Sequence, residues 1–156
     1  LVSKFGGHAM AAGLSIKAKD YSAFSEAFDL EVRRQLTPSD LEAEIFVDGE
    51  LTPEELNLQN GLLIRESGPW GQQFPEPLFQ GTFYIASQRI VGEKHLKLLL
   101  SVDSNQRQLI DAIAFNIDMN SWPDEKKEKV QIVYKMDINF WQGRESLQLI
   151  VESFIL

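Results

Sequence analysis

The sequence contains no cysteine among its 156 residues. This excludes a disulfide and a thiolate metal site, and it fits a reducing compartment, so the cytoplasm is the expected location. No apolar run approaches the roughly 20 residues that a membrane-spanning helix needs, and the N-terminus lacks the layout of a signal peptide. We therefore expect no membrane partner. Because the chain opens on Leu1 in what resembles the middle of an element, we interpret it as a piece of a longer protein.

Catalytic patterns are also scarce. The two histidines, His8 and His95, are far apart in the sequence, and neither belongs to a cluster with metal-ligand spacing. No serine is framed as a nucleophile elbow, and no glycine-rich loop has the spacing and lysine of a phosphate-binding loop. The sequence therefore predicts no catalytic residue, no metal site and no cofactor within this chain.

Positive charge is outnumbered, since 15 Lys and Arg stand against 23 Asp and Glu for a net charge of −8. Most of the excess acid lies in the first half, and seven acids without a base occupy residues 40–55, which we interpret as solvated surface. Residues 79–156 are nearly balanced, with nine bases and ten acids. Because phosphate contacts need cations, this composition weakens a nucleic-acid-binding function without excluding a basic face in the second half.

Periodicity indicates helices and strands in the first 51 residues. The string HAMAAG, residues 8–13, predicts a short helix ended by a glycine, and the alternation of residues 14–18 predicts a strand. Apolar residues at helical spacing predict a helix over 21–36, for which Asp20 is a suitable N-cap. Residues 41–51 alternate again and predict a second strand.

The residues from Thr52 onward predict one helix, then a connector, then a series of strands. The run Thr52-Pro53-Glu54-Glu55 has the form of a capping box and predicts a helix that runs to Glu66. Residues 67–78 are rich in proline, glycine and aromatic residues, which predicts an ordered connector. Residues 79–156 predict five strands with turns about every ten residues. The predicted fold is thus an α+β segment followed by an all-β, five-stranded barrel of the oligonucleotide/oligosaccharide-binding (OB) type.

The opening stretch FGGHAMAAGLSI contains the first candidate site, formed by Gly6, Gly7 and His8. Adjacent glycines let the backbone approach a ligand closely. A helix that begins at His8 would direct its first N–H groups toward an anion such as a phosphate, to which His8 can also donate a hydrogen bond. The alternative is a tight turn whose small residues allow close packing.

The barrel contains the second candidate site. Binding of a single strand needs a cationic groove for the phosphates and aromatic faces on which bases stack. Two strings, RIVGEKHLK and NFWQGRE, place cations and an aromatic residue beside glycine turns. The candidates for phosphate contacts are Arg89, Lys94, Lys97, Lys135 and Arg144, and the candidate for stacking is Trp141, with Trp70 as a second aromatic that fits a structural role better. The alternative is that these cations only alternate outward while the aromatic residues pack inside.

Several strings together resemble a known family. FGGHAMAAGLSI resembles the Gly-Gly-His signature of the DHH-associated domain in DHH-superfamily phosphoesterases. The strings GPWGQQFPEPLF, QRIVGEKHLKLLL, IDAIAFN and GRESLQLIVE resemble the C-terminal region of the RecJ single-stranded-DNA exonucleases. The resemblance extends over nearly the whole chain. It implies that residues 1–66 are the C-terminal part of the DHH-associated domain with connecting helices, 67–78 a connector, and 79–156 the OB-fold nucleic-acid-binding domain.

The resemblance also implies a function. Members of that family remove nucleotides from the 5′ end of single-stranded DNA in repair and recombination, using two divalent metal ions, manganese or magnesium, in an N-terminal DHH domain. This sequence has no Asp-His-His triplet, so we expect the chain to bind single-stranded DNA without cutting it. Gly6, Gly7 and His8 match the substrate-facing motif of the family, in which the glycines admit a phosphate and the histidine contacts it.

Two other functions are compatible with the sequence. The chain could belong to a DHH-family phosphodiesterase of very short oligonucleotides, although such an enzyme has no obvious need for the barrel. Alternatively, the barrel could recruit a protein partner such as a single-strand-binding protein. A folded barrel without a basic groove would favour this recruitment hypothesis.

Overall fold

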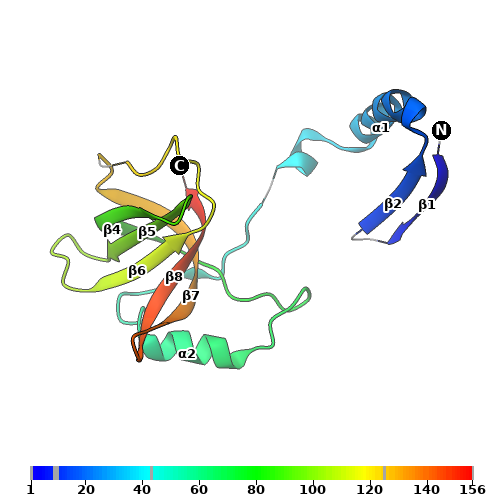
Figure 1. The fold of residues 1–156 in the computed structure, drawn as a ribbon. Helices are drawn as coiled ribbons and strands as arrows, with labels where there is room; N and C mark the ends of the chain where they lie inside the picture. The colour runs from blue at the N-terminus through cyan, green and yellow to red at the C-terminus, as the bar shows by residue number, and fades with distance from the viewer. Residues whose placement is uncertain (1, 9–10, 43, 125, 156) are drawn as a thin grey trace. The chain divides into compact units, whose positions relative to one another are not determined.

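The computed structural model describes residues 2–8, 11–42, 44–124 and 126–155. The chain divides into two compact units, Leu1–Ile45 and Phe46–Leu156. Figure 1 shows both as ribbons. The division falls ahead of helix α2 (Leu58–Ser67), which packs against strands of the second unit. The structure therefore groups this helix with the barrel, whereas the sequence analysis grouped it with residues 1–66.

The first unit begins with a β-hairpin rather than a helix. Strand β1 (Val2–His8) pairs antiparallel with β2 (Ala11–Ile16), and Gly7 lies opposite Ala12. The short helix predicted over residues 8–13 is therefore wrong, although residues 9–10 lie outside the described part. Alanine and methionine favour a helix locally, but the antiparallel pairing of β1 with β2 overrides this propensity. A Cβ atom on Gly7 would lie 2.7 Å from the carbonyl oxygen of Ala11, so this position requires glycine.

A helix follows the hairpin, as predicted. A short 3-10 turn (Ala18–Asp20) leads into α1 (Tyr21–Gln35). Asp20 occupies the N-cap position, but its side chain makes no capping hydrogen bond. Near the end of the helix, two surface ion pairs join residues one helical turn apart. These are Arg33 with Asp29 at 2.8 Å and Arg34 with Glu31 at 2.6 Å. A second 3-10 turn (Pro38–Leu41) ends the ordered elements of this unit.

The second unit opens with less regular structure than the sequence predicted. Among the described residues of 41–51, only Gly49–Glu50 form a strand, β3, in place of the strand predicted over the whole range. The backbone N–H of Thr52 does donate to the carboxylate of Glu55 at 2.8 Å, but α2 begins later, at Leu58. Asn57 caps it, because its side-chain oxygen accepts from the N–H of Asn60 at 2.9 Å. The capping box thus closes a turn and does not open the helix.

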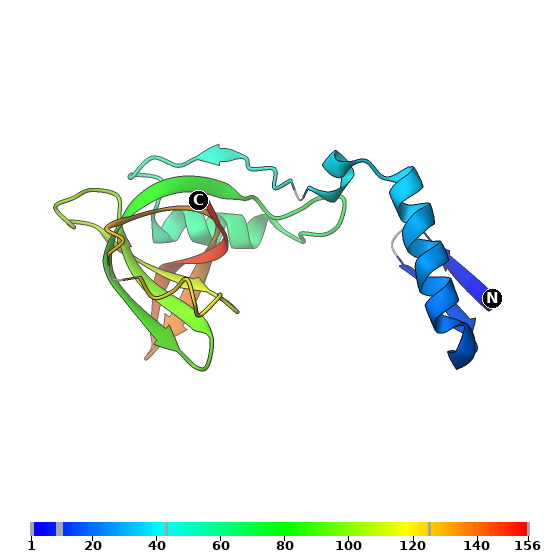
Figure 2. The same ribbon diagram turned by 90° about the horizontal axis from the view of Figure 1, so that it is seen from above.

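A closed, five-stranded mixed barrel follows, as the sequence predicted. Its strands are β4 (Phe79–Val91), β5 (His95–Ser101), β6 (Leu109–Ala114), β7 (Lys129–Trp141) and β8 (Arg144–Ile155). The sheet order is β3-β4-β5-β6-β8-β7, and pairing of β4 with β7 closes the barrel. Strands β6 and β8 are parallel, and β3 pairs parallel with β4 at the edge of the sheet. Figure 2 shows the same ribbon from above.

The core lies inside this barrel. Its most deeply buried side chains alternate along the strands and are Leu96, Leu98, Leu100, Ile132, Tyr134 and Leu149. Two features cover opposite ends of the β7–β8 ladder. Gly61 of α2 lies close to Ile138 and Leu147 at one end, and Trp122 stacks on Phe154 at the other, with ring centroids 4.7 Å apart.

The connector between α2 and β4 is ordered by local contacts. The rings of Trp70 and Phe74 stack with centroids 4.9 Å apart, and Gly71 pairs with Phe74 in an isolated bridge. The N–H of Leu78 donates to the Asp48 carboxylate at 3.0 Å. Trp70 is thus packed within the connector.

The buried Tyr134 makes stability sensitive to alkaline pH. Its ring lies against those of Phe79 and Phe83, and its burial, with the charges of Glu50 and Glu55, raises the pKa of its hydroxyl. Above about pH 10 the unfolded chain loses this proton while the folded chain keeps it. We therefore expect the free energy of unfolding to fall as pH rises, by up to about 1.4 kcal/mol for each pH unit.

Urea unfolding at several pH values between about 8 and 11 tests this expectation. The variant Tyr134→Phe should weaken the pH dependence, and Tyr21→Phe, at an exposed position of the first unit, should retain it. An undiminished dependence in Tyr134→Phe would assign the effect to other groups.

Candidate nucleic-acid interface

An open hollow of about 950 Å³ lies on the outer face of the barrel. The strand alternation that fills the core also forms this hollow. Leu96 and Leu98 of β5 point inward, so Lys97 between them points outward, and Asp111 of β6 lies likewise between the buried Ile110 and Ala112. The outward side chains of β4, β5, β6 and β8 therefore share one surface with the tip of the β7–β8 hairpin.

Arg89 lies at one side of this hollow, and the strand register places Lys97 next to it. Arg89 of β4 pairs with Lys97 of β5, which in turn pairs with Ile113 of β6. Neighbouring strands lie about 4.8 Å apart, so these three side chains form a row across the barrel. All three line the hollow.

The β7–β8 hairpin forms the other side. Trp141 pairs directly with Arg144 across the tip. The two residues between them adopt left-handed backbone conformations, with φ of 49° at Gln142 and 78° at Gly143, as a two-residue hairpin turn requires. The indole of Trp141 is 69% exposed, so its ring is available for stacking with a base.

Four of the barrel candidates thus line one hollow, namely Arg89, Lys97, Trp141 and Arg144. Lys94 lies outside that lining, in the turn between β4 and β5. Lys135 also lies outside it, and its ammonium group is 2.8 Å from the Glu152 carboxylate and 3.7 Å from that of Glu76. The hydrogen bond to Glu152, together with the charge of Glu76, raises the pKa of Lys135.

The lining of the 950 Å³ hollow has a net positive charge, although the chain as a whole is acidic. It contains three cations, Arg89, Lys97 and Arg144, and two acids, Asp111 and Glu145. The Lys97 ammonium group lies 3.1 Å from the Asp111 carboxylate, and Glu145 lies 3.7 Å from the guanidinium group of Arg65 on α2. No ion pair within the described residues engages Arg89 or Arg144, so both remain available to phosphates.

The sequence analysis missed the uncharged polar part of the site. Gln148 lines the hollow opposite Asp111, and Asn139 lines it from β7. Their amides can both donate and accept hydrogen bonds. Their outward direction follows from alternation with the buried Ile138 and Leu149, which was a signal in the sequence. The position of Gln148 next to Asp111 depends on the parallel pairing of β6 with β8, which local patterning does not reveal.

The first unit holds Gly6, Gly7 and His8 on strand β1. No helix begins at His8, so the helix-terminus argument for an anion site there is wrong. The close approach of β2 to Gly7 explains one of the two glycines by packing alone. The substrate-facing role of the three residues stays a prediction.

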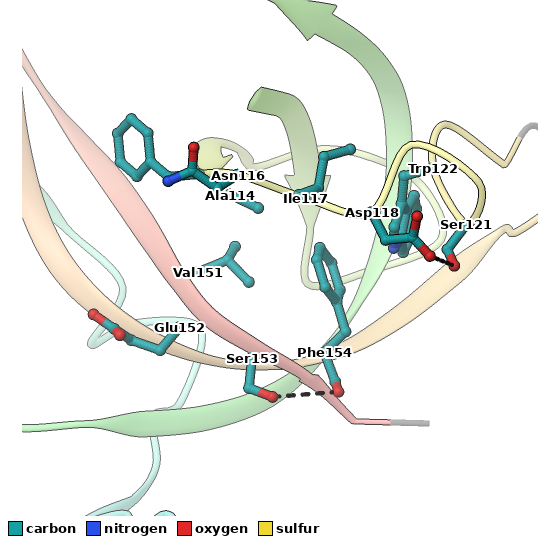
Figure 3. Close-up of a pocket in the computed structure, with 11 residues that line it drawn as sticks. Ala114, Asn116, Ile117, Asp118, Ser121, Trp122, Val151, Glu152, Ser153 and Phe154 are labelled. Carbon is teal, nitrogen blue, oxygen red and sulfur yellow. Dashed lines mark hydrogen bonds between the residues drawn. The ribbon is translucent and has the colours of Figure 1, made fainter. Parts of the chain in front are cut away.

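A second, smaller hollow of about 350 Å³ lies between the β6–β7 loop and the end of β8. Figure 3 shows Val151, Trp122 and Phe154 around it. Asp118 at its edge accepts from the N–H of Asn120 and the hydroxyl of Ser121, which holds the pKa of this carboxyl below its usual range. Neither Lys nor Arg belongs to its described lining, so it does not suit a phosphate.

The part of the chain that the structure describes has neither a candidate metal centre nor a candidate membrane-spanning helix. No group of three or more His, Asp or Glu there could hold a metal ion. None of the helices in that part of the chain is long and apolar enough to cross a membrane.

Comparison with known proteins adds independent findings. The family model described as the RecJ OB domain matches residues 47–153. The single-stranded-DNA-specific exonuclease RecJ of Escherichia coli K12 is 46% identical over 153 residues, and that of Haemophilus influenzae is 44% identical over 154. These matches cover 98% and 97% of this chain but only 26% and 27% of those proteins, so the chain spans about a quarter of their length.

Solved structures agree on the fold. The structure of RecJ from Thermus thermophilus in complex with Mn²⁺ matches with a TM-score of 0.75 at 22% identity. The match covers 100% of this chain and 22% of that one. The complex of the same protein with Mg²⁺ matches with a TM-score of 0.74 at 21% identity, over 99% of this chain and 23% of that one.

The placement of the cations predicts unequal contributions to binding of a polyanion. Replacing Arg144 by Gln removes a cation without an ion pair from the hollow, so the slope of log K against log salt for a single-stranded oligonucleotide should fall by about 0.7. Lys135→Gln removes the same charge from a lysine that two carboxylates already hold, and it should change the slope less. Fluorescence anisotropy titrations at several salt concentrations measure both slopes. Equal changes would show that position relative to the hollow does not matter.

Proposed function

The chain belongs to the RecJ OB-domain family, and on that premise we propose that it is the strand-binding C-terminal part of a single-stranded-DNA-specific exonuclease. In this proposal the whole enzyme acts from the 5′ end in DNA repair and recombination, and this part holds the strand. One observation carries the proposal. Although the chain is acidic as a whole, the outer face of its barrel has a hollow in which two available arginines and an exposed tryptophan are brought together.

The arrangement suits a single strand in two ways. Arg89 and Arg144 offer charge to the phosphates, and the open ring of Trp141 offers a stacking surface to a base. The hollow lies on the strand face and beside the hairpin loop through which OB folds bind oligonucleotides. Stacking needs an unpaired base, so Trp141 favours single strands over duplex.

We assign phosphodiester hydrolysis to a part of the enzyme outside this chain. The structures from Thermus thermophilus are complexes with Mg²⁺ and Mn²⁺, which supports a divalent metal in the whole enzyme. The donor groups of the described residues do not fit such a centre. The contribution of this chain is therefore to bind and orient the strand.

The recruitment hypothesis receives less support. Its condition was a barrel without a basic groove, and the barrel has a positive hollow. A single-strand-binding protein stays a predicted partner, for which no contact surface is proposed.

Anisotropy of a labelled single-stranded oligonucleotide tests the proposal, with a matched duplex as the comparison. We expect saturable, salt-sensitive binding of the chain that prefers the single strand. The variant Trp141→Ala should weaken this binding by about 1–3 kcal/mol, the usual value of one stacked base. Phe140→Ala is the matched control, because Phe140 is similarly exposed but lies outside the lining. Absence of binding at low salt, or equal losses in the two variants, would contradict the proposed site.

The histidine of the first unit needs the whole enzyme for its test. His8→Ala should lower kcat on a 5′-phosphorylated strand because a hydrogen bond to the phosphate is lost, and it should leave the fold intact. Ser3→Ala on the same strand serves as the control. Normal turnover in His8→Ala would remove this residue from the substrate-facing motif.

A further inference from the structure

We propose that Asp111 makes the hollow selective for single strands by keeping phosphates away from its floor. The floor is the part of the lining that Lys97, Asp111 and Gln148 form on β5, β6 and β8. The inference rests on the proposed function, since it concerns how the same hollow distinguishes two forms of nucleic acid. A carboxylate in a phosphate-binding hollow is otherwise unexpected, because it repels the ligand.

Asp111 is fixed at the centre of the hollow by strand pairing. It lies opposite Leu99 of β5 on one side and Gln148 of β8 on the other. Lys97 lies opposite Ile113, two residues further along β6, so the two charges meet diagonally at 3.1 Å. Their side chains are 27% exposed for Lys97 and 34% for Asp111. Partial burial reduces screening by salt, so the pair holds its geometry better than a surface pair does.

The ion pair changes what the floor can bind. The charge of Lys97 is largely cancelled, which leaves Arg89 and Arg144 at the two sides as the available cations of the described lining. Gln148, opposite Asp111 on β8, and Asn139, on β7, add amide groups to the lining. Carboxylates and amides are the groups that recognise base edges, since they accept from base amino groups and, for amides, also donate. The floor therefore suits bases, and the sides suit phosphates.

Single strands and duplexes meet this pattern differently. A single strand can direct its phosphates to the arginines and its bases to the floor. A duplex keeps its bases paired inside and presents phosphates on its surface, so a phosphate is the group that reaches Asp111. Because Asp111 already holds the ammonium group of Lys97, this phosphate meets a carboxylate and finds no free cation there. A group that denies the wrong ligand a favourable contact is an effective source of specificity.

The test compares binding of single-stranded and duplex oligonucleotides of the same length by Asp111→Asn and wild type. Loss of the carboxylate frees Lys97 for a phosphate, so the salt slope for duplex should steepen by about 0.9. We expect duplex affinity to rise about fivefold or more at low salt, and affinity for the single strand to change less. The preference for single strands should therefore fall.

Three further variants exclude simpler explanations. Asp137→Asn makes the same charge change at an exposed residue on β7 that also pairs with Gln148 but lies outside the lining, so it should keep the preference. Asp111→Glu retains the charge and should restore the preference. Asp111→Ser is a second neutral variant, and circular dichroism and urea unfolding show whether each variant is folded.

The outcomes separate the two proposals. If wild type binds no single strand at low salt, both fail. Suppose that wild type binds single strands as proposed, and that the folded variants Asp111→Asn and Asp111→Ser have the same preference for single strands and the same salt slope for duplex as Asp137→Asn. In that case only the role of Asp111 is overturned. A loss of preference in the Asp111 variants alone, with a steeper duplex slope, supports it.

Discussion

Closure of the barrel by the pairing of β4 with β7 is the constraint on which the rest of the second unit depends. A closed sheet has a single inside, so every strand must alternate in phase with its neighbours. Leu98, Ile132 and Leu149 meet in the interior, and each fixes the outward direction of the residues beside it. The outward direction of the side chains in the site therefore follows from the packing of the core. No loop has to fold over a ligand to bring Arg89, Lys97 and Asp111 together.

In the second unit, the local charge of the surface depends more on which charged groups pair with one another than on how many there are. Lys97 and Lys135 both lie on the outer face of the barrel, and both have acidic neighbours. The partner of Lys97 lines the hollow with it, whereas those of Lys135 anchor β7 to β8 and to the connector. A net charge of −8 is thus compatible with a locally positive surface, because acids elsewhere engage cations outside the hollow or face solvent. The net charge of the whole chain therefore does not reveal a locally positive surface of this kind.

The sequence predicted the barrel well because its strands alternate strongly and are separated by clear turns. All five strands occur within residues 79–156, as predicted, and the glycine turn in NFWQGRE is the tip of the β7–β8 hairpin. The hairpin of residues 2–16 was missed because glycine and alanine carry no apolar pattern from which to choose between helix and strand. The late start of α2 was missed because Asn57 caps the helix in place of Thr52. The partners of Lys97 and Asp111 depend on register between distant strands, which no local string encodes.

The turn at Gln142 and Gly143 sets the geometry of two functional groups at once. Both residues adopt positive φ, and the paired strands behind them run in register from Ile138 and Leu147 to Trp141 and Arg144. The stacking ring and the cation are therefore one rigid module with a single covalent attachment to the barrel at each end. The hairpin of residues 138–147 thus presents its aromatic platform and its charge as one unit, and a change in the length of the turn would displace both together.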